Sequence, residues 1–575
     1  MKVLLIPALR KTGGTGHLRR CVRLLSLLDP ASRILCPAGP GLWTAGEIIS
    51  RFAPGLDADR LAAGPEGRWD YILFDRRETT KKEFLELTAG RPSLGLDEGG
   101  EARPLFSFLV DTFPRLASGR PPNIQNEALI AEGPSSAFRV PETLKTALIS
   151  FGGEDPCDLT GLTLKAFAAS GLFSPADTGI VRGPAFSSPP PAGRGELYAG
   201  LEDIRPLFKK YDCVFTSFGI TPYEVLRAGG IPLLVNPGGY HEKLSRKAGF
   251  YSLGVKKISA KKLRKIAARP GGALLKLGAK DFPETGFRGV LENFSPAGAS
   301  LCPICGGGRR RPLLRSSEAT FFRCACGMTY REGFSRGGVR YDRDYFFEGY
   351  RRQYGKTYLE DFGVIEGFAR RRLSALSGLC AGLAGKTLLD IGCAYGPFLS
   401  AARSAGCLPL GIDIAQDAVR YVQDALRIPA LCGDFPAMSE GVIAPAGKFD
   451  IITLWFVIEH FRAPACALSK ISALLKKGGV LAFSTPNGRG VSGLFFSKKF
   501  LKNSPQDHYT IWNPRSCASI LRRFGFRVRK IRVSGHHPER FPRPLRLFPG
   551  LRVCGLASRI FALGDTFEVY AEKIS

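Results

Sequence analysis

The chain has 575 residues, too many for one ordinary hydrophobic core, so two to four domains are expected. A hydrophobic content of 44% and a mean hydropathy of -0.01 are typical of a soluble globular protein. No run approaches the roughly 18 consecutive apolar residues of a membrane helix. The net charge of +30 suits nucleic acid, an anionic membrane surface or an anionic substrate such as a nucleotide sugar. Scattered basic residues on a solvated surface would give the same total.

The amino terminus does not resemble a signal peptide. Its apolar run is short and is followed by Arg10 and Lys11 in place of a small-residue cleavage site. Four of the 15 cysteines cluster between residues 302 and 326 and the others are dispersed, which is not a disulfide framework. We therefore expect a cytoplasmic protein. The sequence indicates no particular oligomeric state.

The first expected strand is Lys2–Pro7, and the glycine loop GGTGH follows it, ending at Gly16 and His17. A glycine loop that leads into a helix offers free backbone N–H groups to a phosphate or another anion. His17 lies at the mouth of this turn, where an imidazole that titrates near neutrality could act as a general base. Capping or packing of the helix entry is the alternative role for His17.

Strands alternating with helices predict two doubly wound lobes, residues 1–140 and 141–290, with a cleft between them. In the second lobe Gly152 follows an expected strand at Ala147–Phe151. A further strand at Cys213–Ser217 precedes three more candidates. Gly219 and Thr221 could donate to a diphosphate, and Glu224 could accept from a ribose hydroxyl.

The motifs GGTGHLRRC, ISFGGEDPCDLT and TSFGITPYEVLRAGGIPLLV resemble those of the GT-B-fold UDP-sugar hydrolase of pseudaminic acid biosynthesis. The resemblance implies that His17 activates water to displace UDP, and that the nucleotide sugar is bound by Gly16, Gly152, Gly219, Thr221 and Glu224. The chain departs from the family at Phe218, where glycine is usual, and at Tyr240–Glu242, which replaces an Asn-Gln pair. A degenerate binding lobe and a true glycosyltransferase stay open as alternatives.

Two close pairs of cysteines follow a Gly/Pro-rich boundary at about residue 300. Their spacing predicts a structural zinc ribbon over residues 300–335, with the ligands Cys302, Cys305, Cys324 and Cys326. The second pair is C-x-C where C-x-x-C is usual, so four free thiols are the alternative. A closed site of four cysteines would stabilise the fold and not catalyse. A helical connector is expected over residues 336–379.

The stretch KTLLDIGCAYG predicts a buried strand that ends at Asp390 and enters a helix through Gly392 and Gly396. Small residues in such a turn let a nucleoside approach the backbone at the carboxyl end of the strand. A second strand ends at Asp413, about 20 residues later, where a carboxylate can accept both ribose hydroxyls. A short third strand leads to Asp434, which could bind the adenine amino group, and Phe435, which could cover the ring.

Further strands are expected at FDIITLW, VLAFSTPN, FGFRVRKIRV and DTFEVYAEK, the last two pairing antiparallel. With DIGCAYG, GIDI, GDF and LKKGG, these segments make residues 380–575 similar to a class I S-adenosylmethionine-dependent methyltransferase. The resemblance implies that Gly392 and Gly396 admit the methionine end of the cofactor and that Asp390 supports it. It also implies that Asp413 holds the ribose and that Asp434 lies at the adenine. A dinucleotide-binding domain would require G-x-G-x-x-G, which is missing here.

Candidates to act on the substrate follow the fourth strand. Glu459 and His460 lie where a catalytic group could face the cofactor, and so does His508. Methyl transfer from a sulfonium needs in-line placement of the nucleophile, and a base only if the nucleophile carries a proton. Each residue could instead orient or pack under a loop. His536 and His537 could equally be a surface pair.

We therefore predict an α/β protein with a GT-B-like pair of lobes, a zinc ribbon and a Rossmann-like seven-stranded methyltransferase domain. The expected activity is methylation of a sugar or nucleotide sugar for a surface glycan, fused to a UDP-sugar hydrolase or glycosyltransferase-like module. One alternative keeps the first half as a non-catalytic nucleotide-sugar-binding module. Another is a nucleic-acid methyltransferase, which the +30 charge favours but the missing N-P-P-Y-like base-flipping signature does not.

Overall fold

The computed structural model describes residues 1–10, 16–114, 121–131, 135–138, 140–153, 155–183, 186, 195–201, 203–279, 282, 286–294, 301–334, 345–445 and 447–574. The chain divides into two compact units, residues 1–300 with 315–318 and residues 301–314 with 319–575. None of the fifteen cysteines is paired in a disulfide. Among the described residues no helix combines the length and apolar character that crossing a bilayer requires.

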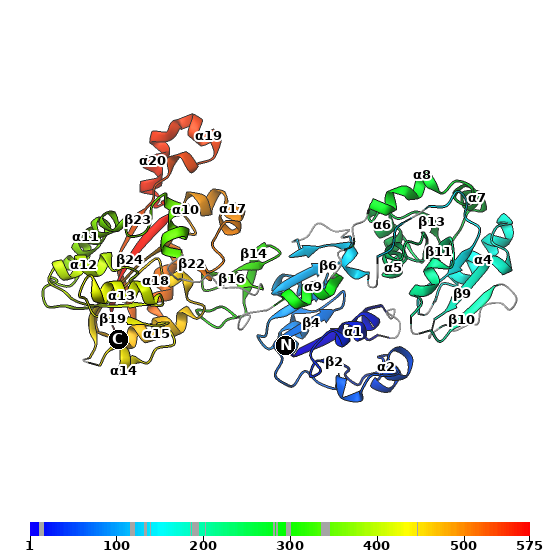
Figure 1. Ribbon diagram of the computed structural model, residues 1–575, viewed down its shortest axis with the longest axis horizontal. Helices are drawn as coiled ribbons and strands as arrows, with labels where there is room; N and C mark the ends of the chain where they lie inside the picture. The colour runs from blue at the N-terminus through cyan, green and yellow to red at the C-terminus, as the bar shows by residue number, and fades with distance from the viewer. Residues whose placement is uncertain are drawn as a thin grey trace. The chain divides into compact units, whose positions relative to one another are not determined.

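The first lobe of the amino-terminal unit is a parallel sheet of seven strands in the order β3-β2-β1-β4-β5-β6-β7 (Figure 1). Its central strands are apolar runs buried along their whole length, as expected where helices cover both faces of a parallel sheet. The strands are β1 Val3–Pro7, β2 Arg33–Leu35, β3 Leu61–Ala62, β4 Tyr71–Asp75, β5 Ser93–Leu96, β6 Phe108–Asp111 and β7 Ile124–Gln125. The helices are α1 Gly16–Ser26, α2 Ala45–Phe52 and α3 Lys81–Thr88.

The second lobe repeats this topology with six parallel strands in the order β10-β9-β8-β11-β12-β13. Two doubly wound sheets are therefore confirmed in the first half. The strands are β8 Ala147–Ile149, β9 Thr178–Arg182, β10 Glu196–Ala199, β11 Cys213–Thr216, β12 Pro232–Asn236 and β13 Ser252–Val255. The helices are α4 Leu159–Ser170, α5 Thr221–Arg227, α6 Gly239–Lys247, α7 Ala260–Ala268 and α8 Gly271–Leu274.

A last helix of this unit, α9 (Gly286–Asn293), returns to the first lobe. Phe294, directly after it, is 2% exposed. Its ring meets Tyr71 of β4 edge-on at 4.8 Å and lies 5.4 Å from Phe108 of β6. The first lobe therefore gains part of its core from residues that follow the second lobe in sequence.

The carboxyl-terminal unit is built on a seven-stranded sheet in the order β19-β18-β17-β20-β21-β24-β23. Only β24 runs antiparallel to its neighbours, so the predicted pairing of the last two strands is confirmed. The strands are β17 Thr387–Ile391, β18 Leu408–Asp413, β19 Ala430–Cys432, β20 Phe449–Trp455, β21 Leu475–Pro486, β23 Phe526–Ser534 and β24 Thr566–Lys573. The helices are α10 Tyr350–Tyr354, α11 Phe362–Leu379, α12 Pro397–Ser404, α13 Gln416–Asp424, α14 Glu440–Ile443, α15 Pro464–Leu474, α16 Val491–Phe495, α17 Ser497–Lys502, α18 Pro514–Arg522, α19 Arg543–Leu545 and α20 Leu551–Ile560.

Helix α11, the end of the expected connector, belongs to this unit. Its buried residues Ala369, Leu373 and Leu376 share a core with α12 and the strands β17, β20 and β21. Residues 336–344, the start of that connector, lie outside the described residues.

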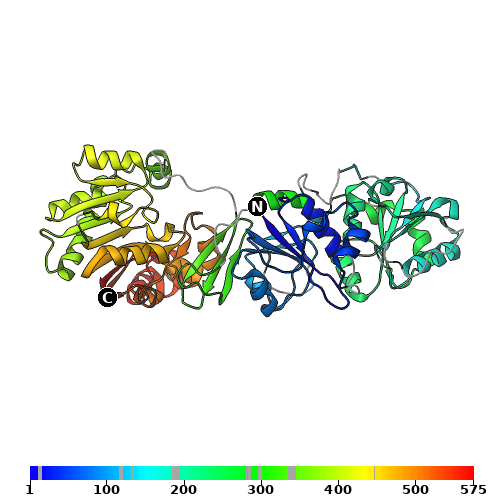
Figure 2. The ribbon, with the colours of Figure 1, turned by 90° about the horizontal axis from the view of Figure 1, so that it is seen from below.

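The cysteine-rich segment forms a small sheet in the order β14-β15-β16-β22, with β14 Arg310–Arg315, β15 Ala319–Cys324, β16 Thr329–Gly333 and β22 Thr510–Ile511. β16 pairs antiparallel with both β15 and β22, so the ribbon takes its fourth strand from the far end of the chain. In Figure 2 the green ribbon strands lie beside orange parts of the chain. Phe322 and Tyr330 belong to the same hydrophobic core as Leu389 and Phe483 of the large sheet. The ribbon and the large sheet are therefore packed as one body.

Candidate functional site

The turn after β17 requires its glycines. Gly392 and Gly396 have φ angles of +74° and +79°, in the left-handed region that favours glycine. A Cβ on Gly392 would overlap the side chain of Val457, and one on Gly396 would lie 2.8 Å from Cδ1 of Leu426. The backbone therefore comes close to the loop after β20 at Gly392 and to the end of α13 at Gly396, leaving no room for a side chain at either position.

Asp413, at the end of β18, is joined to this turn. Its carboxylate accepts a 2.8 Å hydrogen bond from the N–H of Ala394 and another from the N–H of Ala415. Burial raises the pKa of Asp413, although these backbone donors oppose the shift. Each carboxylate oxygen can accept a further hydrogen bond, so a pair of ligand hydroxyls would fit here.

Asp390, at the end of β17, is 2% exposed and accepts a 2.6 Å hydrogen bond from the hydroxyl of Thr453 on β20. Burial raises its pKa to about 7 against this hydrogen bond. A cationic group bound beside Asp390 would stabilise the ionised carboxylate.

The turn after β19 has an exposed residue and a buried one. Asp434 is exposed, whereas Phe435 is 2% exposed and packs 6.2 Å from the ring of Phe461. The ammonium group of Lys470 lies 5.4 Å from the Phe435 ring centroid. Phe435 therefore anchors the turn in the core and presents little surface to a ligand.

A cluster of ionisable side chains follows β20. Glu459 and His460 lie in a single 3₁₀ turn, Ile458–His460, and the ring of His508 meets that of His460 edge-on at 4.7 Å. One ligand atom from each of Glu459, His460 and His508 lies within 4.8 Å of the others. The structure thus brings together the three residues that the sequence proposes near the cofactor.

Asp507 joins this cluster as a residue that sequence reasoning missed. Its Oδ2 lies 3.0 Å from Nδ1 of His460. Burial lowers the pKa of His460, but Asp507 and Glu459 outweigh it and the net shift is upward. Burial and the neighbouring His460 lower the pKa of His508 to about 4, and burial raises that of Glu459 to about 7.

The four cysteines of the ribbon converge on one point. The Sγ atoms of Cys302 and Cys326 are 3.6 Å apart and those of Cys305 and Cys324 3.5 Å, and all four lie within 4.8 Å of one another. Tetrahedral zinc with bonds of about 2.3 Å would separate its sulfurs by about 3.8 Å. The donor set and spacing therefore fit zinc, and the C-x-C pair doesn't prevent convergence.

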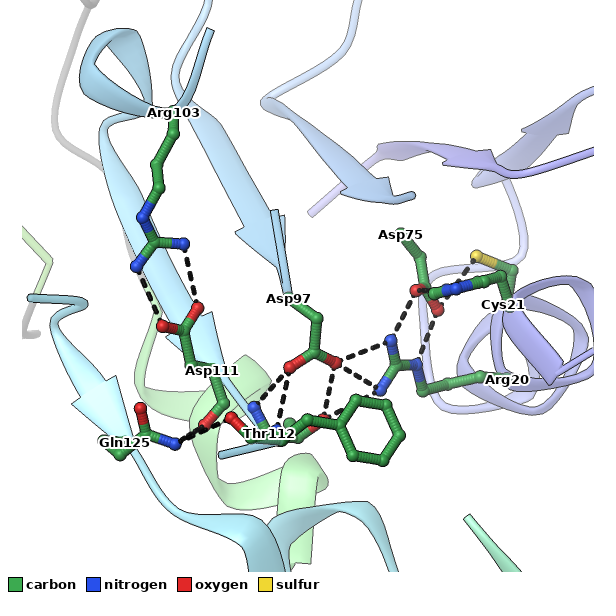
Figure 3. A network of polar contacts seen from close by, with 10 residues as sticks. Arg20, Cys21, Asp75, Asp97, Arg103, Asp111, Thr112 and Gln125 are labelled. Carbon is green, nitrogen blue, oxygen red and sulfur yellow. Dashed lines mark hydrogen bonds and ion pairs between the residues drawn. The ribbon is translucent and has the colours of Figure 1, made fainter. Parts of the chain in front are cut away.

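In the amino-terminal unit, His17 at the start of α1 places Nδ1 2.6 Å from Oδ1 of Asp75. Arg20 bridges Asp75 and Asp97, and its guanidinium also donates to the hydroxyl of Thr112 (Figure 3). Burial would raise the pKa of Asp75, but Arg20 and His17 hold it at about 2. Sequence reasoning missed Asp75 and Asp97, although each ends a buried strand, the signal that identified Asp390 and Asp413.

The remaining predicted residues of this unit are dispersed over several elements. Gly16 begins α1, while Gly13–Thr15 of the same loop lie outside the described residues. Gly152 follows β8 with a φ of +87°, and Gly219 and Thr221 precede and begin α5.

Glu224 is 5% exposed and forms a 2.7 Å ion pair with Arg23 of α1. A ribose hydroxyl would therefore share this carboxylate with Arg23. Glu242, part of the departure from the hydrolase motif, accepts hydrogen bonds from Asn236 and Ser252 and so connects β12 to β13.

Comparison with known proteins identifies relatives of the carboxyl-terminal unit. Residues 365–531 match the family described as methyltransferase domain. The ubiquinone biosynthesis O-methyltransferase of Aromatoleum aromaticum is 30% identical over 166 residues, which are 28% of this chain and 71% of that protein. The enzyme of the same name from Thiobacillus denitrificans is 28% identical over 166 residues, with 28% of this chain and 72% of that protein covered.

Among solved structures, the magnesium protoporphyrin IX methyltransferase of Synechocystis PCC 6803 covers 40% of this chain and 97% of its own, at 18% identity and a TM-score of 0.29. A likeness this low adds nothing to the argument. The family match begins at residue 365 and so does not bear on the first unit.

Proposed function

Because the chain belongs to the S-adenosylmethionine-dependent methyltransferases through residues 365–531, we propose that this unit methylates a hydroxyl of a sugar or nucleotide sugar. The observation that carries the methyl-donor site is the pair of buried carboxylates, Asp390 and Asp413, beside a turn in which Gly392 and Gly396 have no room for a side chain. The two relatives are O-methyltransferases by name, which supports oxygen as the acceptor atom.

The residues at the turn fit S-adenosylmethionine, which supplies a methyl group on a sulfonium. Asp413 would accept from the two ribose hydroxyls, and Asp390 would pair with the ammonium of the methionine part. Gly392 and Gly396 would let that part reach the backbone, and the exposed Asp434 would meet the adenine amino group. The ligand would add hydrogen-bond donors to Asp413 and a positive charge beside Asp390, and so favour the ionised carboxylates that burial disfavours.

Among the side chains of the protein, Glu459 is the proposed general base. Neither of its oxygens accepts a well-formed hydrogen bond from the described residues, although the Thr485 hydroxyl opposes the rise of its pKa. A carboxyl with a pKa of about 7 is well matched to proton transfer at neutral pH. The acceptor oxygen would bond to the methyl carbon as the carbon–sulfur bond breaks, leaving its electron pair on sulfur. The hydroxyl proton would pass to the Glu459 carboxylate.

The test incubates the full chain with S-adenosylmethionine and a panel of sugars and UDP-sugars, read by mass spectrometry. We expect a product heavier by one methylene, lost in Asp413→Ala and reduced at least about tenfold in Glu459→Gln. Asp424→Asn, an exposed change on α13, is the matched control and should methylate normally. Methylation of tRNA or DNA, with no sugar methylated, would replace the proposal by the nucleic-acid alternative.

For the first unit we propose a GT-B-like UDP-sugar hydrolase or glycosyltransferase, because Asp75 holds Nδ1 of His17 as a base-orienting carboxylate does. Release of UDP that is lost in His17→Ala would support this activity, whereas UDP-sugar binding without release would favour the non-catalytic module. Methylation coupled to either activity would serve surface glycan synthesis. Cysteines that form no disulfide would suit the reducing cytoplasm that we propose as the location.

A further inference from the structure

The Glu459 carboxylate is buried with unusually poor hydrogen bonding. The residue is 1% exposed, and neither of its oxygens accepts a well-formed hydrogen bond from the described residues, with the Thr485 hydroxyl as a poorly placed donor. Buried charged groups are normally paired, or they coordinate a metal. Two imidazoles, His460 and His508, stand next to this carboxylate.

We propose that Glu459, His460 and His508 bind a divalent first-row transition metal ion, which holds and acidifies the acceptor hydroxyl during methyl transfer. The role in methyl transfer rests on the function proposed above, whereas the metal site itself rests on the geometry of the cluster.

The geometry suits coordination. One ligand atom from each residue lies within 4.8 Å of the others, close enough for bonds of about 2.0–2.2 Å after small side-chain adjustments. Oδ2 of Asp507 lies 3.0 Å from Nδ1 of His460. A carboxylate behind a ligating histidine orients the ring and increases its basicity.

The ligand chemistry selects the metal. Two imidazoles and one carboxylate favour Zn²⁺, Mn²⁺, Fe²⁺ or Co²⁺ over Mg²⁺ and Ca²⁺, which prefer oxygen ligands. Three protein ligands leave coordination positions open, unlike the closed set of four cysteines in the ribbon. This second site would therefore be suited to substrate binding.

The place of the cluster connects it to the methyl donor. Glu459 lies two residues after Val457, whose side chain packs against Gly392 in the turn after β17. An ion here could bind two neighbouring hydroxyls of a sugar as a chelate and bring one of them to the methyl group. The bound hydroxyl would lose its proton to solvent, since the ion lowers its pKa. The oxygen–carbon bond would then form as the carbon–sulfur bond breaks, with the electron pair left on sulfur.

The test of the site uses the full chain with zinc retained in the four-cysteine ribbon and all further metal removed. This protein is titrated with Mn²⁺ and followed by electron paramagnetic resonance. Mn²⁺ prefers nitrogen and oxygen ligands, so the thiolates of the ribbon do not compete for it. We expect the wild type to reduce the free Mn²⁺ signal at one site per chain, and Glu459→Gln and His508→Ala to lose this binding. Asp507→Asn should weaken binding by about 10–100-fold. The exposed pair His537 and Glu539 provides matched controls, His537→Ala and Glu539→Gln, which should bind normally.

Failure of the wild type to bind Mn²⁺, Co²⁺ or Zn²⁺ beyond the ribbon site would overturn the metal site without relying on any variant. Unchanged methylation in protein that carries zinc only in the ribbon would overturn the role of the ion in methyl transfer and leave Glu459 as an unassisted base. Metal binding with no methylation of any sugar would support the site and count against the proposed acceptor.

Discussion

The backbone N–H of Tyr509 donates a 2.9 Å hydrogen bond to the carbonyl oxygen of Glu459. The carbonyl of Tyr509 in turn accepts from the N–H of Arg331, on the ribbon strand β16. A short chain of backbone hydrogen bonds thus connects the cysteine ribbon to the turn that carries the buried carboxylate. His508 lies next to Tyr509, so the ribbon also fixes the approach of this imidazole.

We propose that the four cysteines of the ribbon hold zinc, and loss of this metal should therefore affect methylation. We expect Cys326→Ser to lower the melting temperature of the carboxyl-terminal unit and reduce kcat at least about tenfold, because structural zinc sites contribute on the order of 10 kcal/mol to folding. Calorimetry and the methylation assay measure the two effects. Cys432→Ser, an exposed cysteine outside the cluster, is the control. Unchanged melting and turnover in Cys326→Ser would show that the ribbon does not support the site.

Binding of the methyl donor should strengthen with pH. Asp390 has a pKa of about 7 in the folded protein, and a bound ammonium favours its ionised form, so binding releases a proton below that pH. We expect the Kd for S-adenosylhomocysteine to fall by up to about tenfold per pH unit below 7 and to level off above it. Calorimetry in two buffers of different ionisation enthalpy measures the released proton. Asp390→Asn should remove this part of the dependence, leaving that of the ligand amine.

The same substitution should stabilise the protein without ligand at neutral pH. The pKa of Asp390 is raised on folding, so the carboxyl binds more protons in the folded than in the unfolded chain between about pH 4 and 7. Stability is therefore lost as pH rises through that window. We expect Asp390→Asn to raise the free energy of unfolding at pH 8 by about 1–2 kcal/mol and to have little effect below pH 4. Denaturant unfolding of the wild type and the Asp390→Asn variant at pH 8 and below pH 4 measures this difference.

Gly392→Ala should weaken cofactor binding by at least about tenfold, because the new methyl group overlaps Val457 and the φ of +74° is strained for alanine. The double variant Gly392→Ala/Val457→Ala removes the overlap and should recover part of the affinity. Equal affinities for the single and double variants would mean that backbone strain alone is responsible.

Substitutions of His17 and Asp75 should differ in their effects on UDP release and on the free energy of unfolding. We expect His17→Ala to abolish UDP release while changing the free energy of unfolding by less than about 1 kcal/mol, because the imidazole is partly exposed. Asp75→Ala should cost about 3–5 kcal/mol as well, since it leaves the buried Arg20 without its main partner. Paired UDP-release and unfolding measurements test this, and equal destabilisation by both changes would contradict it.

The sequence alone determined the order of elements and the cofactor turn. The expected third and fourth strands of the second half coincide with β19 and β20. Short apolar runs bounded by turn residues mark both the presence and the ends of a buried strand. Asp390 and Asp413 could be identified because each ends such a strand, and carboxyl ends of neighbouring parallel strands meet at one edge of the sheet.

Only the tertiary structure decided which distant residues meet. It paired Glu224 with Arg23, directed Phe435 into the core and brought His508 and Asp507 to Glu459 and His460. It also showed that β22 completes the sheet of the ribbon and that the ribbon shares a hydrophobic core with the large sheet. Local periodicity records which face of an element is apolar. Which element packs on this face, and which charged side chains form ion pairs, depend on packing between segments far apart in the chain.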